Sequence, residues 1–310
     1  MNLEILVSKF GGGVVYNAPT IKLFGKRVNE YPSNTNLFVV LSAFGKTTND
    51  LEDLVDAFFK YSDSDGISGM LERIKDVHIN IAKELFSVDS STLSYVIEKI
   101  ENIVNYIEEF GWTFRGHFRY DLFYDQIVPC GEELSSLIAS LYLREIGIEN
   151  VLMNTCDLIK TNSFFRKAEV NMEETNRCVT KEVLPIFFNR KNTILSQGFM
   201  GSFDGIHRFK TTLGREGSDY SAAIFAWALK AREVHLWKNV PGIMDKDPYV
   251  PGGEDAKPIG DLSYKRCREL LHGTARGVIH PETINLLESA RIPLRVLSFE
   301  NPELPGTLIS

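Results

Sequence analysis

Cysteine is scarce in this sequence, and its spacing argues against two common kinds of stabilised protein. The 310 residues include four cysteines that lie far apart, without a Cys-x-x-Cys pair or the Cys/His spacing of a zinc site. A disulfide framework is not expected either. We interpret the four side chains as buried free thiols: Cys130, Cys156, Cys178 and Cys267.

The sequence also lacks a long apolar run, a secretory signal and an excess of positive charge. No run reaches 18 apolar residues, and the N-terminus has neither the basic segment nor the cleavage site of a signal peptide. The formal charge of -7 and the pI near 5.5 argue against nucleic acid or an anionic membrane as a partner. We expect a cytoplasmic protein that holds anionic ligands with local positive groups.

Apolar sequence is plentiful, and it falls into alternating strand and helix patterns. Hydrophobic residues make up 44% of the chain, enough for one large α/β domain or two ordinary ones. The alternation predicts a mostly parallel sheet covered by helices, with ligands at the carboxyl ends of its strands. The expected strands are 3–10, 36–43, 150–155, 193–197, 233–238 and 294–298, and the expected helices are 48–61, 132–147, 218–231, 264–272 and 281–290.

Two stretches depart from this alternation. A helical excursion from the sheet is expected over about residues 68–128, where apolar residues recur at three- and four-residue spacing. After the strand at 193–197, the sequence is rich in glycine, serine and aspartate, and we interpret it as a loop.

Lys9 stands at the carboxyl end of the first strand, directly before Gly11, Gly12 and Gly13. Glycine lets backbone N–H groups approach phosphate oxygens, and an ammonium group can meet their charge. The glycines alone are better explained by a strand that ends in a flexible turn, but the position of Lys9 favours a phosphate site. Neither the dinucleotide-binding nor the P-loop glycine motif is present.

The segment from Thr211 to Ser221 combines two glycines, an arginine, an aspartate and several hydroxyls just before an apolar helix. Ser218 or Asp219 would cap that helix. Capping does not explain Arg215, whose planar fork suits bidentate recognition of a carboxylate or phosphate at a helix N-terminus.

Two further stretches are ambiguous when each is taken alone. Glu132 opens the helix at 132–147, where an acidic residue is commonly an exposed partner of the helix dipole. Residues 237–248 follow a strand and contain polar side chains with a Pro-Gly turn, which also describes an ordinary loop.

Five strings in this order resemble aspartate kinases of the amino acid kinase family. They are KFGGG at 9–13, VLSAFGKTTNDL at 40–51, GEELSS at 131–136, TTLGREGSDYSAA at 211–223 and VPGIMDKDP at 240–248. Residues 278–281, 292–296 and 305–309 also look like the family. The resemblance spans the whole chain, and the string at 211–223 is its most specific part.

The resemblance implies a fold, a reaction and a division into lobes. The expected fold is a three-layer α/β/α sandwich, with an aspartate-binding lobe over residues 1–205 and a lobe over 206–310 that binds MgATP. The expected reaction makes 4-phospho-L-aspartate, an acyl phosphate, in the first step toward lysine, threonine and methionine. Many members continue into regulatory ACT domains, whereas this sequence stops at Ser310, after the last kinase-like strand. We therefore expect no ACT domain and no feedback inhibition by an end-product amino acid. A homodimer is compatible with the resemblance.

The resemblance also carries roles onto matching residues of this sequence. Lys9 would face the transferring phosphoryl group, Glu132 would meet the ammonium group of aspartate, and Arg215 its α-carboxylate. The implied catalytic residues are Lys9 and Asp219; the implied substrate residues are Ser42, Thr48, Glu132, Phe165, Arg215 and Ser218; the implied ATP-binding residues are Gly11, Gly12, Lys238, Asn239, Met244, Asp247 and Arg276. Mg²⁺ is the expected metal, without a dedicated set of protein ligands.

The amino-acid side of the pattern departs from the family at three positions. Gly13 and Val14 replace a Thr-Ser pair and remove two hydroxyls. Glu216 replaces a glycine and adds a carboxylate beside the anionic pocket, where it would clash with aspartate or ATP unless it turns outward.

The nucleotide side departs further. Lys238-Asn239 stands where a Thr-Asp pair is usual, Tyr249 replaces an arginine and Gly277 a lysine, for which Arg276 is a candidate substitute. The leading interpretation is an active aspartate kinase. The alternatives are an enzyme for another small acid and a non-catalytic paralogue that binds ligand or pairs with a full-length kinase.

Overall fold

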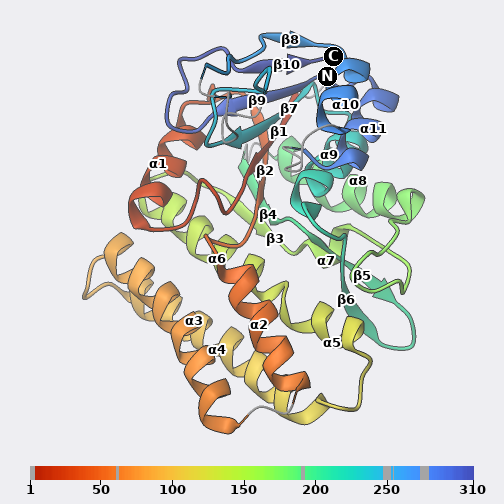
Figure 1. The fold of residues 1–310 in the computed structure, drawn as a ribbon. Coiled ribbons are helices and arrows are strands. Elements are labelled where there is room, and N and C mark those ends of the chain that lie inside the picture. The colour runs from red at the N-terminus through yellow and green to blue at the C-terminus, as the bar shows by residue number, and fades with distance from the viewer. Residues whose placement is uncertain (1–3, 61–62, 190–192, 247–252, 254, 273–278) are drawn as a thin grey trace.

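A computed structural model describes residues 4–60, 63–189, 193–246, 253, 255–272 and 279–310 (Figure 1). Its described residues contain an eight-stranded sheet in the order β3-β4-β2-β1-β7-β9-β10-β8. The neighbouring pairs are parallel except for β10, which runs antiparallel to β9. The strands are β1 (Ile5–Phe10), β2 (Asn36–Leu41), β3 (Val151–Met153), β4 (Thr193–Gln197), β7 (Glu233–Lys238), β8 (Asp261–Leu262), β9 (Leu294–Ser298) and β10 (Thr307–Ile309).

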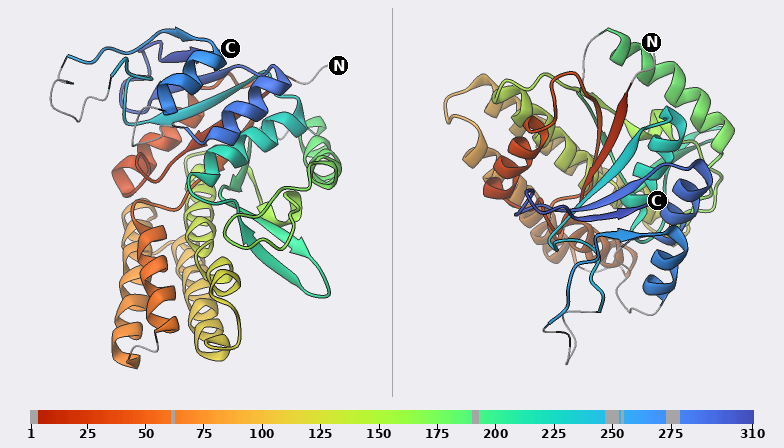
Figure 2. Two further views of the ribbon diagram at one scale, coloured as in Figure 1. Left: turned by 45° about the vertical axis from the view of Figure 1, so that its right-hand side comes forward. Right: turned by 90° about the horizontal axis from the view of Figure 1, so that it is seen from above.

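Helices cover both faces of this sheet, and the predicted three-layer α/β/α sandwich is confirmed (Figure 2). The alternation along β1 shows how the layers form, since Leu6 and Phe10 join one apolar core while Ile5 and Val7 join the other. Side chains of α1 (Ala18–Asn29) and α6 (Cys130–Glu145) belong to the first core. The second core is packed by α8 (Met172–Phe188), α9 (Gly217–Leu229), α10 (Tyr264–His272) and α11 (Pro281–Ala290).

The helical excursion lies below the sheet in Figure 1 and continues the first core. It consists of α3 (Ser64–Leu85), α4 (Ser91–Phe114) and α5 (Tyr120–Ile127), which lead into α6. Helix α2 (Thr47–Phe59) packs beside it. Helix α3 begins four residues before the predicted start of the excursion. The carboxylate of Asp63 accepts a hydrogen bond from the N–H of Gly66 at 2.7 Å, a cap that the apolar spacing alone does not reveal.

Three predictions at the level of elements were wrong or incomplete. The stretch after β4 is not a loop but an antiparallel hairpin of β5 (Met200–Asp204) and β6 (Arg208–Thr212). The expected strands did not include the short strands β8 and β10. Helix α1, the short α7 (Thr155–Leu158) and α8 were not predicted, and the polar residues within them obscured the helical period.

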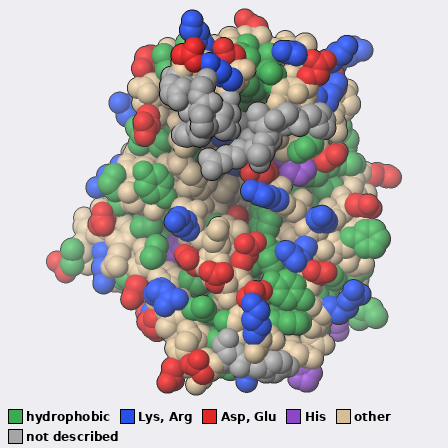
Figure 3. Space-filling view, viewed as in Figure 1, with side chains coloured by type: hydrophobic (Ala, Val, Ile, Leu, Met, Phe, Trp, Pro, Cys, Tyr) green, Lys and Arg blue, Asp and Glu red, His purple; other side chains and the backbone are tan. Residues whose placement is uncertain are grey.

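Figure 3 views the molecule from the side of Figure 1 and shows how charge is distributed over that face. Acidic and basic side chains are interspersed over the helical excursion and beside the sheet. No helix among the described residues is both long enough and apolar enough to cross a membrane.

The contact between α2 and α4 provides a test of how tightly the excursion is packed. A Cβ atom added to Gly111 would lie 2.3 Å from Cζ of Phe58, closer than packed atoms allow. Although alanine in a helix interior normally gains about 1 kcal/mol over glycine, we expect Gly111→Ala to lower the free energy of unfolding by about 1–3 kcal/mol. Urea denaturation measures this difference.

Gly69 in α3 is the matched control for this prediction. Its added Cβ would meet only the end of the Arg73 side chain, at 3.9 Å. The Gly69→Ala variant should therefore show the ordinary stabilising effect. Equal stabilisation by both substitutions would contradict the packing at Gly111.

Candidate functional site

Three neighbouring strands carry their carboxyl ends to the same edge of the sheet. Lys9, near the end of β1, is paired in register with Val40 of β2 and Leu236 of β7. The alternation along β1 places Lys9 on the same face as Ile5 and Val7, the face covered by α9. This edge is where an open parallel sheet is expected to bind its ligands.

A buried carboxylate joins two lysines at this edge. Nζ of Lys9 lies 2.6 Å from Oδ1 of Asp219, and Nζ of Lys238 donates a hydrogen bond to Oδ2 at 3.0 Å. The Oδ1 contact is an ion pair without hydrogen-bond geometry. Burial alone would raise the pKa of Asp219, but Lys238 and Lys9 outweigh it and hold this pKa at about 2. Burial lowers the pKa of Lys9, and Asp219 opposes that shift.

Lys9 opens into a cleft of about 850 Å³. The cleft brings together seven residues that the sequence assigned to catalysis or substrate binding: Lys9, Ser42, Thr48, Glu132, Phe165, Arg215 and Ser218. Asp219 itself is fully buried and holds Lys9 from behind the wall of the cleft. The cleft therefore joins residues from β1, the end of β2, α2, α6, the 161–167 segment and α9.

The cleft wall contains further residues that sequence reasoning missed. They are Asn49, Glu52, Asp121, Tyr124, Arg166, Lys167, Phe199, Gly214 and Gly217. Glu216 also lines the cleft, as its place beside the anionic pocket predicted. A local signal existed for Glu52, because it lies four residues after Thr48 and so shares a face of α2 with it. Asp121 and Tyr124 have no such signal, since only the packing of α5 beside α2 brings them to the cleft.

Glu132 faces the cleft from the first turn of α6 and is almost fully buried. Its Oε1 accepts a hydrogen bond from the N–H of Ala43 at 3.2 Å, whereas Oε2 has no partner among the described residues. Burial raises the pKa of Glu132 to about 8, although the hydrogen bond from Ala43 and the charge of Lys9 act in the opposite direction. A ligand with a positive group would supply the missing partner of Oε2.

Among the glycines after Lys9, Gly12 is the one that close packing requires. A Cβ atom on Gly12 would lie 2.5 Å from the carbonyl oxygen of Ala43, and one on Gly11 would lie 3.1 Å from Nζ of Lys9. The loop after β1 therefore packs directly against the loop after β2, and any side chain at Gly12 would separate them.

The segment before α9 differs from the sequence prediction. Neither Ser218 nor Asp219 caps the helix, which begins at Gly217 after Glu216. The carboxylate of Asp219 is engaged by the two lysines instead. Glu216 adopts the left-handed region at φ +62°, a conformation that favours glycine, and it is exposed at the cleft.

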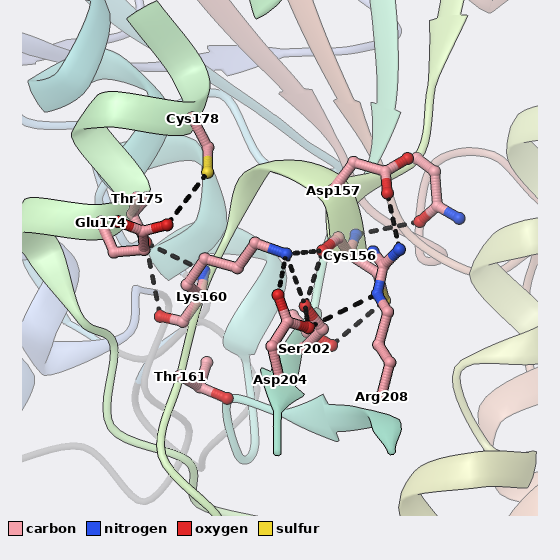
Figure 4. Close-up of polar contacts among 12 residues, drawn as sticks. Cys156, Asp157, Lys160, Thr161, Glu174, Thr175, Cys178, Ser202, Asp204 and Arg208 are labelled. Carbon is pink, nitrogen blue, oxygen red and sulfur yellow. Dashed lines mark hydrogen bonds and ion pairs between the residues drawn. The ribbon is translucent and has the colours of Figure 1, made fainter. Parts of the chain in front are cut away.

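A polar cluster holds the hairpin β5–β6 against α7 and α8 (Figure 4). Nζ of Lys160 contacts Oδ2 of Asp204 at 2.7 Å, and it also donates hydrogen bonds to the Cys156 carbonyl and Ser202 hydroxyl oxygens. Arg208 pairs with Asp157 at 2.8 Å. Lys160 immediately precedes the 161–167 segment, so its contacts hold the start of the segment that brings Phe165 to the cleft.

The residues assigned to ATP differ in how close they lie to this cleft. Gly11 lies beside Lys9, and Lys238 is linked to Lys9 through Asp219. Asn239 is exposed after β7, and Met244 bridges to Pro258, but neither lines the cleft. His280, which sequence reasoning missed, caps α11 and stacks on Tyr220 at a centroid distance of 5.5 Å. Asp247, Tyr249, Arg276 and Gly277 lie outside the described residues.

The described residues contain no group of three or more His, Cys, Asp or Glu side chains that could hold a metal ion. Two of the carboxylates around Lys9, Asp219 and Glu216, differ in availability. Asp219 forms ion pairs with two lysines, whereas Glu216 lines the cleft and is exposed. A metal ion at this site would thus need most of its ligands from a bound substrate.

Comparison with known proteins agrees with this architecture. A family model described as the amino acid kinase family matches residues 4–298. The chain belongs to the amino acid kinase family. It is 30% identical to aspartokinase 1, chloroplastic, of Arabidopsis thaliana over 98% of its own length and 52% of that protein. It is also 30% identical to lysine-sensitive aspartokinase 3 of Escherichia coli over 99% of its own length and 64% of that protein.

A solved structure of this family superposes closely on the chain. It is the crystal structure of E. coli aspartokinase III in complex with aspartate and ADP, with a TM-score of 0.88 and 29% identity. The match covers 99% of this chain and 64% of that chain. This family member thus spans between half and two thirds of the length of these relatives.

The backbone at Glu216 generates a testable prediction. A residue with a Cβ atom in the left-handed region costs roughly 1–2 kcal/mol, part of which glycine regains through its greater freedom when unfolded. We therefore expect Glu216→Gly to raise the free energy of unfolding by up to about 1 kcal/mol. Urea denaturation at fixed pH and salt measures the change.

Glu216→Ala separates the effect of the backbone from the effect of charge. Alanine removes the carboxylate but retains the Cβ atom, so this variant should be no more stable than the parent chain. A gain with alanine as large as the gain with glycine would trace the effect to charge and contradict the interpretation of the backbone.

Proposed function

We propose that this chain transfers the γ-phosphoryl group of ATP to the side-chain carboxylate of L-aspartate. The observation that carries the proposal is the single cleft shared by Lys9, Glu132 and Arg215. These three residues supply one carboxyl group and two cationic groups, the pattern that an amino acid with a second carboxylate requires. The bound ligands named for E. coli aspartokinase III are consistent with it.

In this proposal the amino acid is oriented by charge at both ends of its backbone. Glu132 receives the ammonium group on its unpartnered Oε2, and Arg215 binds the α-carboxylate. Ser42, Thr48 and Ser218 supply polar contacts, and Phe165 forms an aromatic wall. The side-chain carboxylate is thereby directed toward Lys9.

The reaction forms a bond between a carboxylate oxygen and the γ-phosphorus and breaks the bond from that phosphorus to the β-phosphate oxygen. The products are 4-phospho-L-aspartate and ADP. Because the nucleophile is already an anion, no general base is needed, and catalysis rests on positioning and charge stabilisation. In this proposal Lys9 stabilises the transferring phosphoryl group, and its ion pair with Asp219 supports that position.

In this proposal residues 206–310 bind the nucleotide and residues 1–205 bind most of the amino acid. Arg215 and Ser218 are the exceptions, because they belong to 206–310 but contact the amino acid. Lys238, Asn239, Met244, Asp247 and Arg276 remain the proposed nucleotide contacts, together with Gly11 and Gly12. Mg²⁺ would arrive with the triphosphate and offset its charge.

A second candidate is an enzyme of this family that acts on a different small acid. The observation that favours it is Glu216, an extra carboxylate at the wall of the cleft. Because like charges repel, this group disfavours the most anionic substrates. The retained Glu132 and Arg215 still favour an α-amino acid.

Hydroxylamine trapping tests the proposed reaction. The chain is incubated with ATP, Mg²⁺ and L-aspartate, and hydroxylamine converts an acyl phosphate to a coloured hydroxamate. We expect product from the parent chain and a fall in kcat of at least about a hundredfold in Lys9→Ala, since loss of one such stabilising contact raises the barrier by about 3 kcal/mol.

Lys22→Ala is the control, because this lysine lies on α1, away from the cleft. It should leave kcat unchanged. Hydroxamate from another amino acid but not from aspartate would support the second candidate. Absence of product with every amino acid, together with absence of ATP binding, would indicate a non-catalytic paralogue.

The raised pKa of Glu132 predicts proton release when the amino acid binds. With a pKa of about 8, this carboxyl group is mostly neutral near pH 7 in the free protein. An adjacent ammonium group favours the ionised form, so binding should expel close to one proton, and affinity should rise as the pH increases toward 8. Titration calorimetry in two buffers of different ionisation enthalpy measures this release.

Glu132→Gln is the matched control for proton release. It keeps the shape of the side chain but cannot ionise. This variant should bind aspartate more weakly and without proton exchange. The same proton release in both proteins would show that another group titrates.

A further inference from the structure

A carboxylate outside the cleft holds together the two loops that form its amino-acid side. Asp125 lies on α5, is fully buried and does not line the cleft. Its Oδ2 accepts hydrogen bonds from the N–H groups of Arg166 and Thr212, each at 2.9 Å. Its Oδ1 accepts a third hydrogen bond from the Thr212 hydroxyl at 2.7 Å.

The two segments held in this way carry the proposed substrate contacts. Arg166 follows Phe165, and Thr212 lies three residues before Arg215. The segments also contact each other, since the N–H of Ala168 donates to the carbonyl of Thr212 at 2.9 Å. A displacement of either segment at Asp125 would move both the aromatic wall and the cationic group of the cleft.

The backbone at Arg166 shows why an anchor is needed there. Arg166 has a φ of +66°, in the left-handed region that residues with a Cβ atom disfavour. Such a conformation persists only where the surroundings impose it. Helix α5 holds Arg166 through two contacts. Asp125 accepts a hydrogen bond from the backbone N–H of Arg166, and the ring of Tyr124 lies 4.5 Å from its guanidinium group.

Asp125 makes no ion pair with any residue that the structure describes, in contrast to Asp219. Burial raises the pKa of Asp125 to about 7, and the hydrogen bonds from Arg166 and Thr212 oppose this shift. An unpaired buried carboxyl group is unfavourable for stability alone. Its three hydrogen bonds instead supply a fixed geometry for two loops.

We propose that Asp125 is a positioning residue that fixes the 161–167 and 212–217 segments, and that its loss impairs amino-acid binding more than nucleotide binding. This inference rests on the proposed function for the identity of the two substrates. The anchoring of the loops can be measured independently of that function.

The kinetic test compares Asp125→Ala with Asp125→Asn. Alanine removes all three acceptor contacts, so KM for aspartate should rise by about tenfold to a hundredfold while KM for ATP stays within about twofold. Asparagine can accept both N–H groups on its oxygen and donate to the Thr212 hydroxyl. It should therefore restore KM for aspartate to within about threefold of the parent value.

Asn150→Ala is the matched control for a general loss of stability. Asn150 is also buried and makes three hydrogen bonds, to Ser140 and Ile148, away from the cleft. This variant should be less stable but keep both KM values. An equal rise in both KM values in Asp125→Ala, or a rise in KM for aspartate in Asn150→Ala of the same size, would overturn the inference.

Hydrogen exchange of backbone amides supplies the readout that does not depend on activity. In Asp125→Ala, the amides of residues 163–168 and 212–216 should exchange faster than in Asn150→Ala. The two variants are compared at denaturant concentrations that give them the same free energy of unfolding. Unchanged exchange in both segments would overturn the anchor. If the parent chain forms no hydroxamate with any amino acid, the proposed function fails, and the exchange result alone decides the anchor.

Thr212→Val keeps the test decisive if Asp125→Ala does not fold. It removes only the hydroxyl donor and keeps the backbone contacts to Asp125. We expect KM for aspartate to rise by about twofold to fivefold, with KM for ATP unchanged. No rise in KM for aspartate would count against the inference.

Discussion

The ion-paired group of Lys9, Asp219 and Lys238 is the interaction on which the rest of the site depends. It links β1, α9 and β7 at the edge of the sheet where the strands end. A buried charge without a partner would be very unfavourable, so each member of the group requires the others. Two ammonium groups share one carboxylate, and the positive charge left over suits an anionic phosphoryl group beside the cleft.

The remaining walls of the cleft depend on backbone conformations that cost free energy. Arg166, Phe199 and Glu216 all have positive φ values and all line the cleft. Strain of this kind gathers at sites where the backbone must follow a ligand more closely than regular structure permits. Here it is opposed by defined contacts, such as the carboxylate of Asp125 at Arg166 and the hydrogen bond from the N–H of Phe199 to the Ser221 hydroxyl.

Much of the fold could be predicted, because its strands and helices carry local periodic patterns. The strand at 233–238 and the helices at 264–272 and 281–290 have the predicted bounds. The hairpin β5–β6 was missed because its glycines and polar residues resemble those of a loop. Its strands are stabilised by contacts to α5 and α7 that lie far away in the sequence.

The sequence by itself determined the strand that carries Lys9, the glycines that follow it and the apolar helix after Arg215, because these features depend on neighbours within a few residues. Only the tertiary structure decided that Asp219 would serve two lysines rather than cap α9, and that Asp125 would bind two distant loops. Both outcomes depend on which buried charges meet across the core. Local spacing carries no information about partners 19 to 210 residues away.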